Sequence, residues 1–432
     1  MELKKYKLGE VADIQTGPFG SQLHNEDYVK IGIPIVTVEH LGERNFSTQN
    51  LPMVSTYDAD RLKKYSLKPG DIVFSRVGAV DRCSLVEGAQ DGWLFSGRCL
   101  RVRPYNGIDS SFLYYYLNTE SFKSYIRNVA VGCTMPSLNT SILVDVPVWL
   151  PDYKEQHNMG IILEAIDRKI ALNREINRNL EAMARQLYDY WFVQFDFPDE
   201  NGRPYKSSGG KMVWNEKLKQ EIPEGWCIET LGKLANFRNG INYSKGETGT
   251  VCSIVNVRNI SASSLLMDGE EFDKIEIANG KEQNYYISDE DIIIARSGCP
   301  GATRILWQPN NTIFCGFIIC CKPNDIDYRF LITFKLKQLE GTSATQSGGS
   351  ILQNVSQDTL KRVLVLLPNR VVLSSFNQVI KELLLKLYLS INETQLLEHQ
   401  RDHLLPLLMN GQVSVMPREV NCDLAAYFVI LG

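Results

Sequence analysis

The chain has 432 residues, which is too long for one ordinary hydrophobic core and indicates two or more domains. Apolar residues make up 44% of it and charged residues 22%, and these proportions exclude a disordered or fibrous protein. The net charge of -4 gives no global indication of nucleic-acid binding, but it leaves room for a local basic surface.

The N-terminal segment MELKKYKLGE lacks the apolar stretch of a signal peptide. No stretch of the chain approaches the roughly 18 apolar residues of a membrane span. The ten cysteines show no metal-ligand spacing, and the adjacent Cys320 and Cys321 are expected on opposite faces of one strand. We therefore expect reduced cysteines in a cytoplasmic protein that does not contact a membrane.

Residues 1–151 are predicted to form a strand-rich α+β domain. Apolar and polar residues alternate in GIPIVTVEHL (32–41), GDIVFSRV (70–77) and SGRCLRVRP (96–104), a pattern typical of strands. The segment SFLYYYLNTESFKSYI (111–126) instead predicts a short helix with aromatic residues on its buried side.

Residues 152–195 are predicted to form a long helix. No proline interrupts residues 155–193, and apolar residues recur there at alternating steps of four and three. This spacing is a heptad seam, which is typical of a coiled coil. Residues 196–224 follow as a linker rich in Gly, Pro, Ser and charged residues.

The second half of the chain repeats the first. LGKLANFRNG (231–240) matches LGEVADIQTG (8–17), and SDEDIIIARSGC (288–299) matches KPGDIVFSRVGA (68–79). The offset between matched segments falls from 223 to 217 residues, as expected for a duplicated unit with short insertions and deletions. We therefore predict a second strand-rich domain and a second long helix, followed by a tail without a counterpart. Their ranges are 225–368, 369–411 and 412–432.

Polar residues lie in the middle of both helical seams, at Asn173 and Asn177 in the first and at Ser390 and Thr394 in the second. If the helices pair antiparallel, these four side chains share one layer. Buried polar residues at seam positions can fix the register of a coiled coil at some cost in stability. The alternative is that the coil bends there and the four side chains are hydrated.

Four short sequence segments occur along the chain in an order and spacing that are specific. They are TGPFGSQLH (16–24), GDIVFSRVGAVDRC (70–83), the proline-flanked entry into the first helix, and ALNREINRNLEAMARQLYDYWFVQFDFPDENGRPYKSSGGKMVWN (171–215). With the two-unit plan, they make the chain resemble the DNA-specificity subunits of type I restriction-modification systems. The resemblance covers essentially the whole chain, up to about residue 413.

The resemblance implies a binding protein that is not itself an enzyme. In that family each strand-rich unit is a target recognition domain for one half of a split DNA sequence. The two helices form an antiparallel coiled coil with pseudo-twofold symmetry and set the spacer between the half-sites. The implied partners are double-stranded DNA, two methyltransferase subunits and restriction-translocase subunits. No cofactor is expected on this chain, because S-adenosylmethionine, ATP and Mg would be held by the partner subunits.

Glycine-rich loops with polar or cationic neighbours are the candidates for DNA contact, because phosphates need donors and base edges need Arg, Asn, Gln or Ser. A glycine-rich loop can equally be a simple turn, and the matched Arg76 and Arg296 could serve either the fold or a phosphate. Residues that differ between the two copies are better candidates for reading bases. The first domain offers Thr16, Gly17, Phe19, Gly20, Ser21, Gln22, His24, Arg76, Arg82, Thr134, Ser137 and Asn139. The second offers Arg238, Asn239, Tyr243, Ser244, Lys245, Arg258, Asn259, Arg296, Arg304, Ser347, Ser350 and Asn354.

Motifs of enzymes that act on DNA are missing from the sequence. It has no Asn-Pro-Pro-Tyr type loop of an amino-methyltransferase, and SSGGKMV (207–213) lacks the hydroxyl residue and upstream glycine of a phosphate-binding loop. Asp152 with Asp167 and Lys169 fits the letters of a metal-dependent nuclease, but Asp167 lies inside the predicted coil. His399 and His403 are four apart on a helix, which alone is a weak indication of a metal. We predict no catalytic residue and no metal site.

Two other functions remain open from the residues. One is a duplicated scaffold whose helices bind partners and whose strand-rich domains bind peptides, which the acidic net charge mildly favours. The other is a recognition fragment of a single-chain restriction-methyltransferase. A methyltransferase gene beside this one would help to separate them.

Overall fold

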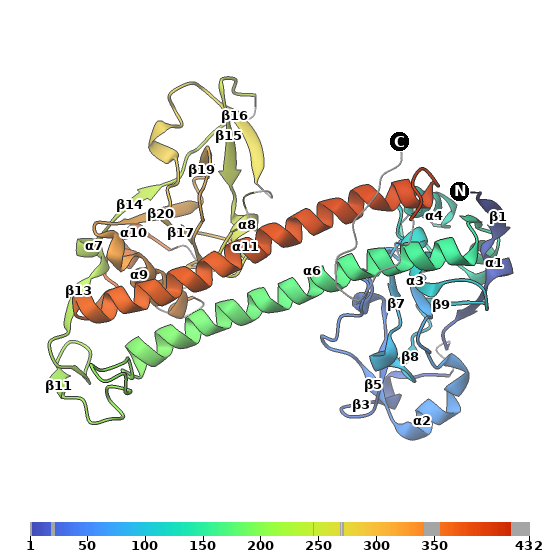
Figure 1. Cartoon of the computed structure of the whole chain (residues 1–432), viewed down its shortest axis with the longest axis horizontal. Helices are drawn as coiled ribbons and strands as arrows, with labels where there is room; N and C mark the ends of the chain where they lie inside the picture. Colours follow the sequence, from blue (N-terminus) through green and yellow to red (C-terminus); the bar gives the residue numbers. More distant parts are fainter. Residues whose placement is uncertain are drawn as a thin grey trace. The chain divides into compact units, whose positions relative to one another are not determined.

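The computed structural model describes residues 2–18, 22–132, 134–244, 246–267, 269, 272–340 and 355–415. The chain divides into two compact units, which we call unit 1 (residues 1–171 and 395–432) and unit 2 (residues 172–394). Two long helices, α6 (Tyr153–Tyr188) and α11 (Arg370–Met409), each contribute to both units (Figure 1). In the part that the structure describes, no helix has the length and apolar character that a membrane span requires.

In the described residues of unit 1 the strands form three sheets, with orders β2-β9-β6-β7, β3-β5-β4-β8 and β1-β10. Its strands are β1 (Lys4–Lys7), β2 (Ala12–Thr16), β3 (Tyr28–Val29), β4 (Ile33–Val36), β5 (Met53–Val54), β6 (Ile72–Ser75), β7 (Cys83–Leu85), β8 (Leu94–Phe95), β9 (Cys99–Pro104) and β10 (Pro147–Leu150). Its shorter helices are α1 (Leu8–Val11), α2 (Thr56–Arg61), α3 (Ser110–Leu117), α4 (Glu120–Val129) and α5 (Thr140–Val144).

The part of unit 2 that the structure describes has four sheets, with strand orders β14-β20-β17-β18, β16-β15-β19, β13-β21 and β11-β12. Its strands are β11 (Met212–Asn215), β12 (Gln220–Pro223), β13 (Cys227–Thr230), β14 (Ala235–Asn239), β15 (Thr250–Val255), β16 (Asp273–Ile277), β17 (Ile292–Ala295), β18 (Thr303–Arg304), β19 (Thr312–Phe314), β20 (Ile318–Pro323) and β21 (Leu364–Leu367). Its shorter helices are α7 (Leu231–Leu234), α8 (Val257–Ala262), α9 (Arg329–Gln338) and α10 (Gln357–Lys361).

The duplication predicted from the sequence is confirmed by the sheet topology. The order β2-β9-β6-β7 in unit 1 corresponds to β14-β20-β17-β18 in unit 2. Even the parallel pair is repeated, since Ile35 lies opposite Leu94 between β4 and β8, and Ile254 lies opposite Ile313 between β15 and β19. The mixed α+β class and the three predicted strand segments are also confirmed.

The predicted helix over residues 111–126 is in fact two helices, α3 and α4. The break falls at Asn118 and Thr119, and the Thr119 side chain accepts a hydrogen bond from the Phe122 amide as the N-cap of α4. A capping threonine satisfies a backbone donor that a continuous helix would satisfy internally, so it stabilises the start of a new helix.

The central sheet of each unit separates two hydrophobic cores. In unit 2, Cys320 belongs to one core and Cys321 to the other, which confirms that these neighbours point to opposite faces of a strand. In unit 1, Phe74 and Val73 divide in the same way. The core that contains Phe74 or Cys321 also contains residues of α6 and α11, and we call it the inner core of its unit; the other is the outer core.

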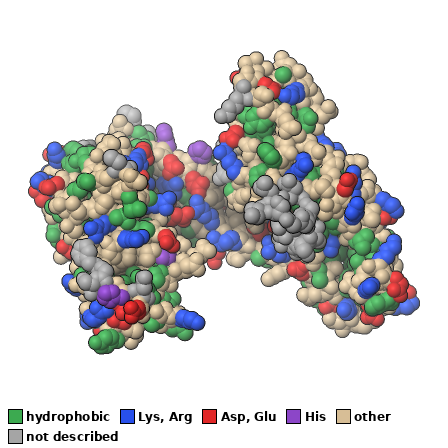
Figure 2. Space-filling view, turned by 180° about the vertical axis from the view of Figure 1, so that it is seen from behind, with side chains coloured by type: hydrophobic (Ala, Val, Ile, Leu, Met, Phe, Trp, Pro, Cys, Tyr) green, Lys and Arg blue, Asp and Glu red, His purple; other side chains and the backbone are tan. Residues whose placement is uncertain are grey.

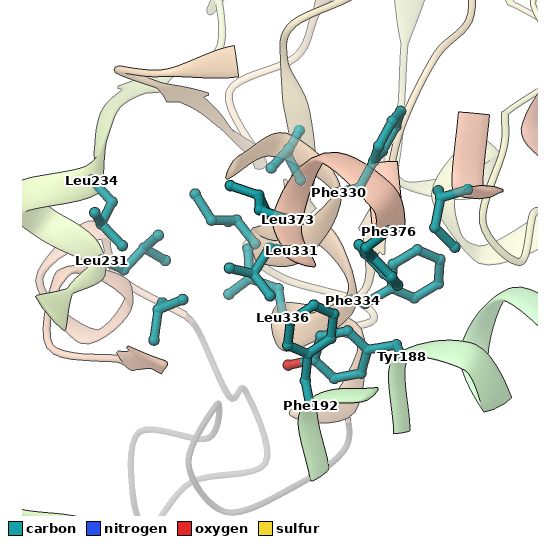
Figure 3. Close-up of a cluster of buried hydrophobic side chains, with 14 of the residues drawn as sticks. Tyr188, Phe192, Leu231, Leu234, Phe330, Leu331, Phe334, Leu336, Leu373 and Phe376 are labelled. Atoms are coloured by element: carbon teal, nitrogen blue, oxygen red, sulfur yellow. The ribbon is translucent and has the colours of Figure 1, made fainter. Parts of the chain in front are cut away.

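Aromatic rings dominate the part of the inner core of unit 2 where α6 and α11 meet (Figure 3). The rings of Phe192 and Phe376 lie edge to face with their centroids 4.8 Å apart. Tyr188 stacks against Phe334 of α9 at 5.8 Å. Such aromatic pairs contribute about 0.5–1.5 kcal/mol each beyond their buried area, so this cluster fixes α6 and α11 to the domain of unit 2.

The helical seam is buried at most of the predicted positions, including Met159 and Leu163 in α6 and Phe376 and Ile380 in α11. The heptad pattern also selects Leu187 and Leu383, which are half-buried, whereas their neighbours Tyr188 and Leu384 are buried. The α-helical part of α6 ends at Tyr188, and a π-helical turn, Asp189–Val193, completes the predicted range.

The two long helices run in opposite directions within each unit. In unit 2, Asn173 donates to Glu393 at 2.8 Å and Tyr188 contacts Phe376, so numbers rise along α6 as they fall along α11. In unit 1, Arg401 pairs with Asp167 at 2.9 Å.

At the polar layer of the seam, the Thr394 hydroxyl donates a hydrogen bond to the Ser390 carbonyl at 2.7 Å. The Asn177 amide oxygen and the Ser390 hydroxyl are buried and accept no hydrogen bond from the residues described. The register role of this layer stays a prediction.

Candidate nucleic-acid interface

Four segments of unit 1 meet where β2 and β6 end and β9 begins. They are residues 16–17, 76–77, 96–99 and 137–138, and we call them the loop edge of unit 1. Backbone hydrogen bonds join them: the Arg76 amide donates to the Arg98 carbonyl (2.8 Å), and the Leu138 amide donates to the Arg76 carbonyl (2.8 Å). The Gly17 amide donates to the Cys99 carbonyl (3.2 Å). The loop edge is therefore rigidly attached to the sheet.

Unit 2 has the same loop edge, formed by residues 239–240, 296–297, 315–318 and 355. The Arg296 amide donates to the Phe317 carbonyl (2.9 Å), and the Val355 amide donates to the Arg296 carbonyl (2.9 Å). The Gly240 amide donates to the Ile318 carbonyl (3.1 Å). Each bond repeats one of unit 1 between matched residues, so two copies of one backbone frame lie in the chain.

Two matched glycines allow the frame to close. A Cβ atom on Gly17 would lie 2.2 Å from the Ser96 carbonyl oxygen, and one on Gly240 would lie 2.0 Å from that of Cys315. No side chain fits at such distances, which explains why the glycine that ends each matched phrase recurs in the repeat.

The predicted DNA-binding residues that lie at the loop edges are Thr16, Gly17, Arg76 and Ser137 in unit 1 and Asn239 and Arg296 in unit 2. The two matched arginines differ in their side-chain contacts. Arg76 donates to the Gly97 carbonyl at 3.1 Å and to the Thr16 hydroxyl at 3.5 Å, so it braces the turn at 96–99. The Arg296 side chain is exposed and forms no hydrogen bond or ion pair with the residues that the structure describes. Arg296 is thus the better candidate for a phosphate contact.

Four of the predicted residues have side chains engaged in the fold. Arg304 is buried, pairs with Glu340 at 2.8 Å and donates to the Ser263 carbonyl at 2.8 Å. Asn259 is buried and accepts from the Asn256 amide. Asn139 caps α5. Arg238 donates to Asp291 at 2.9 Å. These contacts account for the four residues structurally, and we leave them out of the proposed interface.

The remaining candidates lie outside the two loop edges as defined. Arg258 is exposed and paired with Asp273, and Gln22 is half-buried and accepts from the Tyr65 hydroxyl at 2.7 Å. The other surface positions are His24, Arg82, Thr134, Tyr243 and Ser244. Phe19, Gly20, Ser21, Lys245, Ser347, Ser350 and Asn354 lie outside the described residues.

A buried carboxylate lies at the other end of the central sheet in each unit, just before β6 and β17, at the matched positions Asp71 and Asp291, both 1% exposed. The cation that pairs with it comes from different strands. Arg103 of β9 binds Asp71 through two hydrogen bonds of 2.6 Å, whereas Arg238 of β14 binds Asp291. The hydrogen bond to Asp71 raises the pKa of Arg103. Burial, followed by repulsion from Arg103, lowers the pKa of its neighbour Arg101.

The structure adds two residues that the sequence reasoning missed, Arg98 and Phe317. They occupy the same position of the matched turn, Ser96–Cys99 in unit 1 and Cys315–Ile318 in unit 2. Both side chains are exposed, Phe317 by 64%. Aligning SGRCL (96–100) with CGFII (315–319) would have found them, because they differ between otherwise matched copies.

Charge is distributed over the surface without a single dominant sign. On the face in Figure 2, Lys and Arg side chains are interspersed with Asp and Glu. Among the residues that the structure describes, no three His, Cys, Asp or Glu side chains are grouped as metal ligands. Any nucleic-acid contact therefore depends on a few placed side chains more than on overall charge.

Comparison with known proteins identifies the relatives of this chain. Residues 1–182 match the family model described as the type I restriction modification DNA specificity domain. The type I restriction enzyme MjaIX specificity subunit of Methanocaldococcus jannaschii is 23% identical over 73% of this chain and 71% of its own length. The HindI specificity subunit of Haemophilus influenzae is 22% identical over 81% of this chain and 88% of its own.

A solved structure shares the fold. The crystal structure of the type I restriction-modification S subunit from M. genitalium superposes with a TM-score of 0.58, covering 94% of this chain and 96% of that one at 16% identity. The resemblance predicted from the sequence is thereby confirmed: the chain is similar to DNA-specificity subunits of type I restriction-modification systems in sequence, and to an S subunit in fold.

Proposed function

We propose that the chain is the DNA-specificity subunit of a type I restriction-modification complex, and that each unit reads one half of a bipartite, asymmetric site through its loop edge. The observation that carries the proposal is the repeated backbone frame, which presents Arg98 in unit 1 and Phe317 in unit 2. One frame with different side chains suits two half-sites that share a geometry and differ in sequence.

The long helices are proposed to pair as an antiparallel coiled coil with pseudo-twofold symmetry and to set the spacer between the half-sites. The opposite helix directions within each unit and the buried seam support this. The proposed recognition domains are those predicted from the sequence, residues 1–151 and 225–368.

The same helices are proposed to dock two methyltransferase subunits. Each helix carries three exposed apolar side chains with the same spacing of four and seven residues, which places them on one face of the helix. They are Leu172, Ile176 and Met183 in α6 and Leu385, Leu389 and Leu396 in α11, each between 44% and 58% exposed. Exposed apolar stripes mark interaction surfaces, and each long helix carries one. Restriction-translocase subunits would join these, and S-adenosylmethionine, ATP and Mg would be bound by the partners.

The test is methylome sequencing of a methylation-free bacterial host that expresses this chain with its neighbouring methyltransferase subunit. A control host expresses the methyltransferase subunit alone. We expect a new two-part motif with a fixed gap only when both are present. A stable complex that methylates no new motif would contradict the proposal, and the absence of any complex would favour the scaffold alternative.

A further inference from the structure

We propose that Arg98 and Phe317 are the residues that determine one base each in the two half-sites, Arg98 a guanine and Phe317 a thymine. This inference rests on the proposed function, because it places DNA against both loop edges. It goes further by assigning the reading to one position of the frame and by naming the chemical group on the base that each side chain contacts.

The backbone of this position is fixed in the same way in both units. At the start of the turn, the Ser96 amide donates a hydrogen bond to the Val36 carbonyl (2.8 Å). In unit 2 the Cys315 amide donates in the same way to the Val255 carbonyl (3.1 Å). At the end of the turn, the Cys99 amide donates to the Ser96 carbonyl (2.9 Å). In unit 2 the Ile318 amide donates to the Cys315 carbonyl (3.0 Å). The carbonyl of Arg98 or Phe317 accepts from the matched arginine amide. A residue held at both ends projects its side chain with little loss of backbone entropy when a ligand binds.

Arg98 has the chemistry that guanine recognition needs. Its side chain is exposed and forms no ion pair or hydrogen bond with the residues described, so its guanidinium donors are available. Arg76 beside it is occupied in bracing the Gly97 carbonyl. The planar guanidinium fork fits the O6 and N7 acceptors of guanine in the major groove as a bidentate pair, the commonest specific contact of this kind.

Phe317 has the opposite chemistry at the same position. A phenyl ring can neither donate nor accept a conventional hydrogen bond, so it cannot read the polar groups of a base edge. The apolar group that the major groove presents is the C5-methyl of thymine, and phenylalanine is among the side chains that contact it. An aromatic ring that is 64% exposed on a rigid turn would bury much of its surface against that methyl.

The experiment uses the complex of this chain with its methyltransferase subunit and a duplex carrying the motif found by methylome sequencing. Two sets of base analogues probe the contacts, 7-deazaguanine in place of each guanine and deoxyuridine in place of each thymine, one position at a time. For the wild type, we expect one 7-deazaguanine position in one half-site to weaken binding by about fivefold or more. One deoxyuridine position in the other half-site should weaken it by about fourfold, the effect of one buried methyl.

The variants Arg98→Ala and Phe317→Ala should each lose sensitivity at their own position and keep it at the other. Arg98→Lys tests the bidentate fork, because it keeps the charge but should still relax the guanine preference. Lys68→Ala is the matched control, an exposed cation of unit 1 at the opposite end of β6, and should leave every preference unchanged. Both reading residues are exposed, so unfolding midpoints should equal the wild-type value.

The outcomes separate the two levels of the proposal. If the wild-type complex recognises no bipartite motif, the proposed function fails and this inference fails with it. If a motif exists but Arg98→Ala retains the 7-deazaguanine sensitivity, or weakens binding equally at all sequences with a shallower salt dependence, Arg98 contacts phosphate and the inference alone is overturned. Retained deoxyuridine sensitivity in Phe317→Ala overturns the assignment for unit 2.

Discussion

The variant Arg103→Met should destabilise unit 1 strongly, because it leaves the Asp71 carboxylate buried without its cation. Both carboxylate oxygens of Asp71 accept a hydrogen bond of 2.6 Å from Arg103, and Asp71 is 1% exposed. Methionine keeps much of the volume of the arginine stem and removes the charge and the donors. Among the residues that the structure describes, the donor that remains to this carboxylate is the Lys68 amide at 2.8 Å.

Removing one partner of a buried ion pair costs about 3–5 kcal/mol. The Arg103 side chain is 30% exposed, so water can approach the carboxylate from that side, and we expect a value near the lower limit. A loss of about 3 kcal/mol corresponds to a fall of about 6–12 °C in the unfolding midpoint of a unit of this size.

Scanning calorimetry of the full chain measures this fall, and hydrogen-exchange mass spectrometry assigns the transition to unit 1. The control is Arg127→Met, which removes an arginine of the same unit that pairs with Asp81 and Glu120 while 43% exposed. Such a surface pair contributes little to stability, so the control should shift the unfolding midpoint far less. Equal shifts in the two variants would refute the reasoning, as would a double variant Arg103→Met with Asp71→Asn that recovers none of the lost stability.

Unit 2 suggests a rescue, since its arginine reaches the same carboxylate position from the neighbouring strand. Installing the residues of unit 2 on β2 and β9 should restore most of the stability that Arg103→Lys alone removes. The set is Asp13→Asn, Gln15→Arg, Arg101→Cys and Arg103→Lys, which copies Asn236, Arg238, Cys320 and Lys322. A set that is no more stable than Arg103→Lys alone would show that the two arrangements are not equivalent.

Three further predictions concern other parts of the chain. Arg296→Ala should weaken DNA binding equally for all sequences and make the slope of log affinity against log salt concentration shallower by about one. A salt titration followed by fluorescence anisotropy measures this slope. A change of preferred base would contradict the phosphate role. Inserting one heptad into each long helix, after Ala171 and after Thr394, lengthens each helix by about 10 Å. The unspecified spacer of the methylated motif should then grow by about three base pairs. An unchanged spacer in a folded variant would show that helix length does not set the spacer. Burial raises the pKa of Cys83, Cys99 and Cys320 to about 12, so these thiols stay protonated at pH 8. Iodoacetamide should therefore label the exposed Cys227 before these three buried cysteines. Peptide mapping of native and denatured protein measures this, and labelling of Cys320 before Cys227 would contradict it.

The sequence predicts the fold well because short segments of the repeat each carry the pattern of their own strand or turn. Alternating runs such as GDIVFSRV predict strands, and the glycine that ends LGEVADIQTG marks the close approach of Gly17 to Ser96. The single helix expected over residues 111–126 was wrong because a capping threonine in the middle of an apolar pattern outweighs the periodicity.

The candidate site is less predictable, because the role of an arginine depends on its neighbours in space. Arg238 and Arg304 look like free cations in the sequence. Arg238 is bound by Asp291, 53 residues away, and Arg304 by Glu340, 36 residues away, and each also donates to carbonyl oxygens of distant segments. Arg98 carries no motif, and the matched hydrogen bonds of the turn establish that it is equivalent to Phe317.

The division of each unit into inner and outer cores bears on how such a protein can evolve. The inner cores keep equivalent helices, α3 and α5 in unit 1 and α9 and α10 in unit 2. The outer cores have already diverged, with α2 packed on one and α8 on the other. A sheet between them shields one side from changes on the other. Mutation and recombination can therefore remodel the outer side while the inner side, which anchors the long helices, stays under unchanged selection for stability.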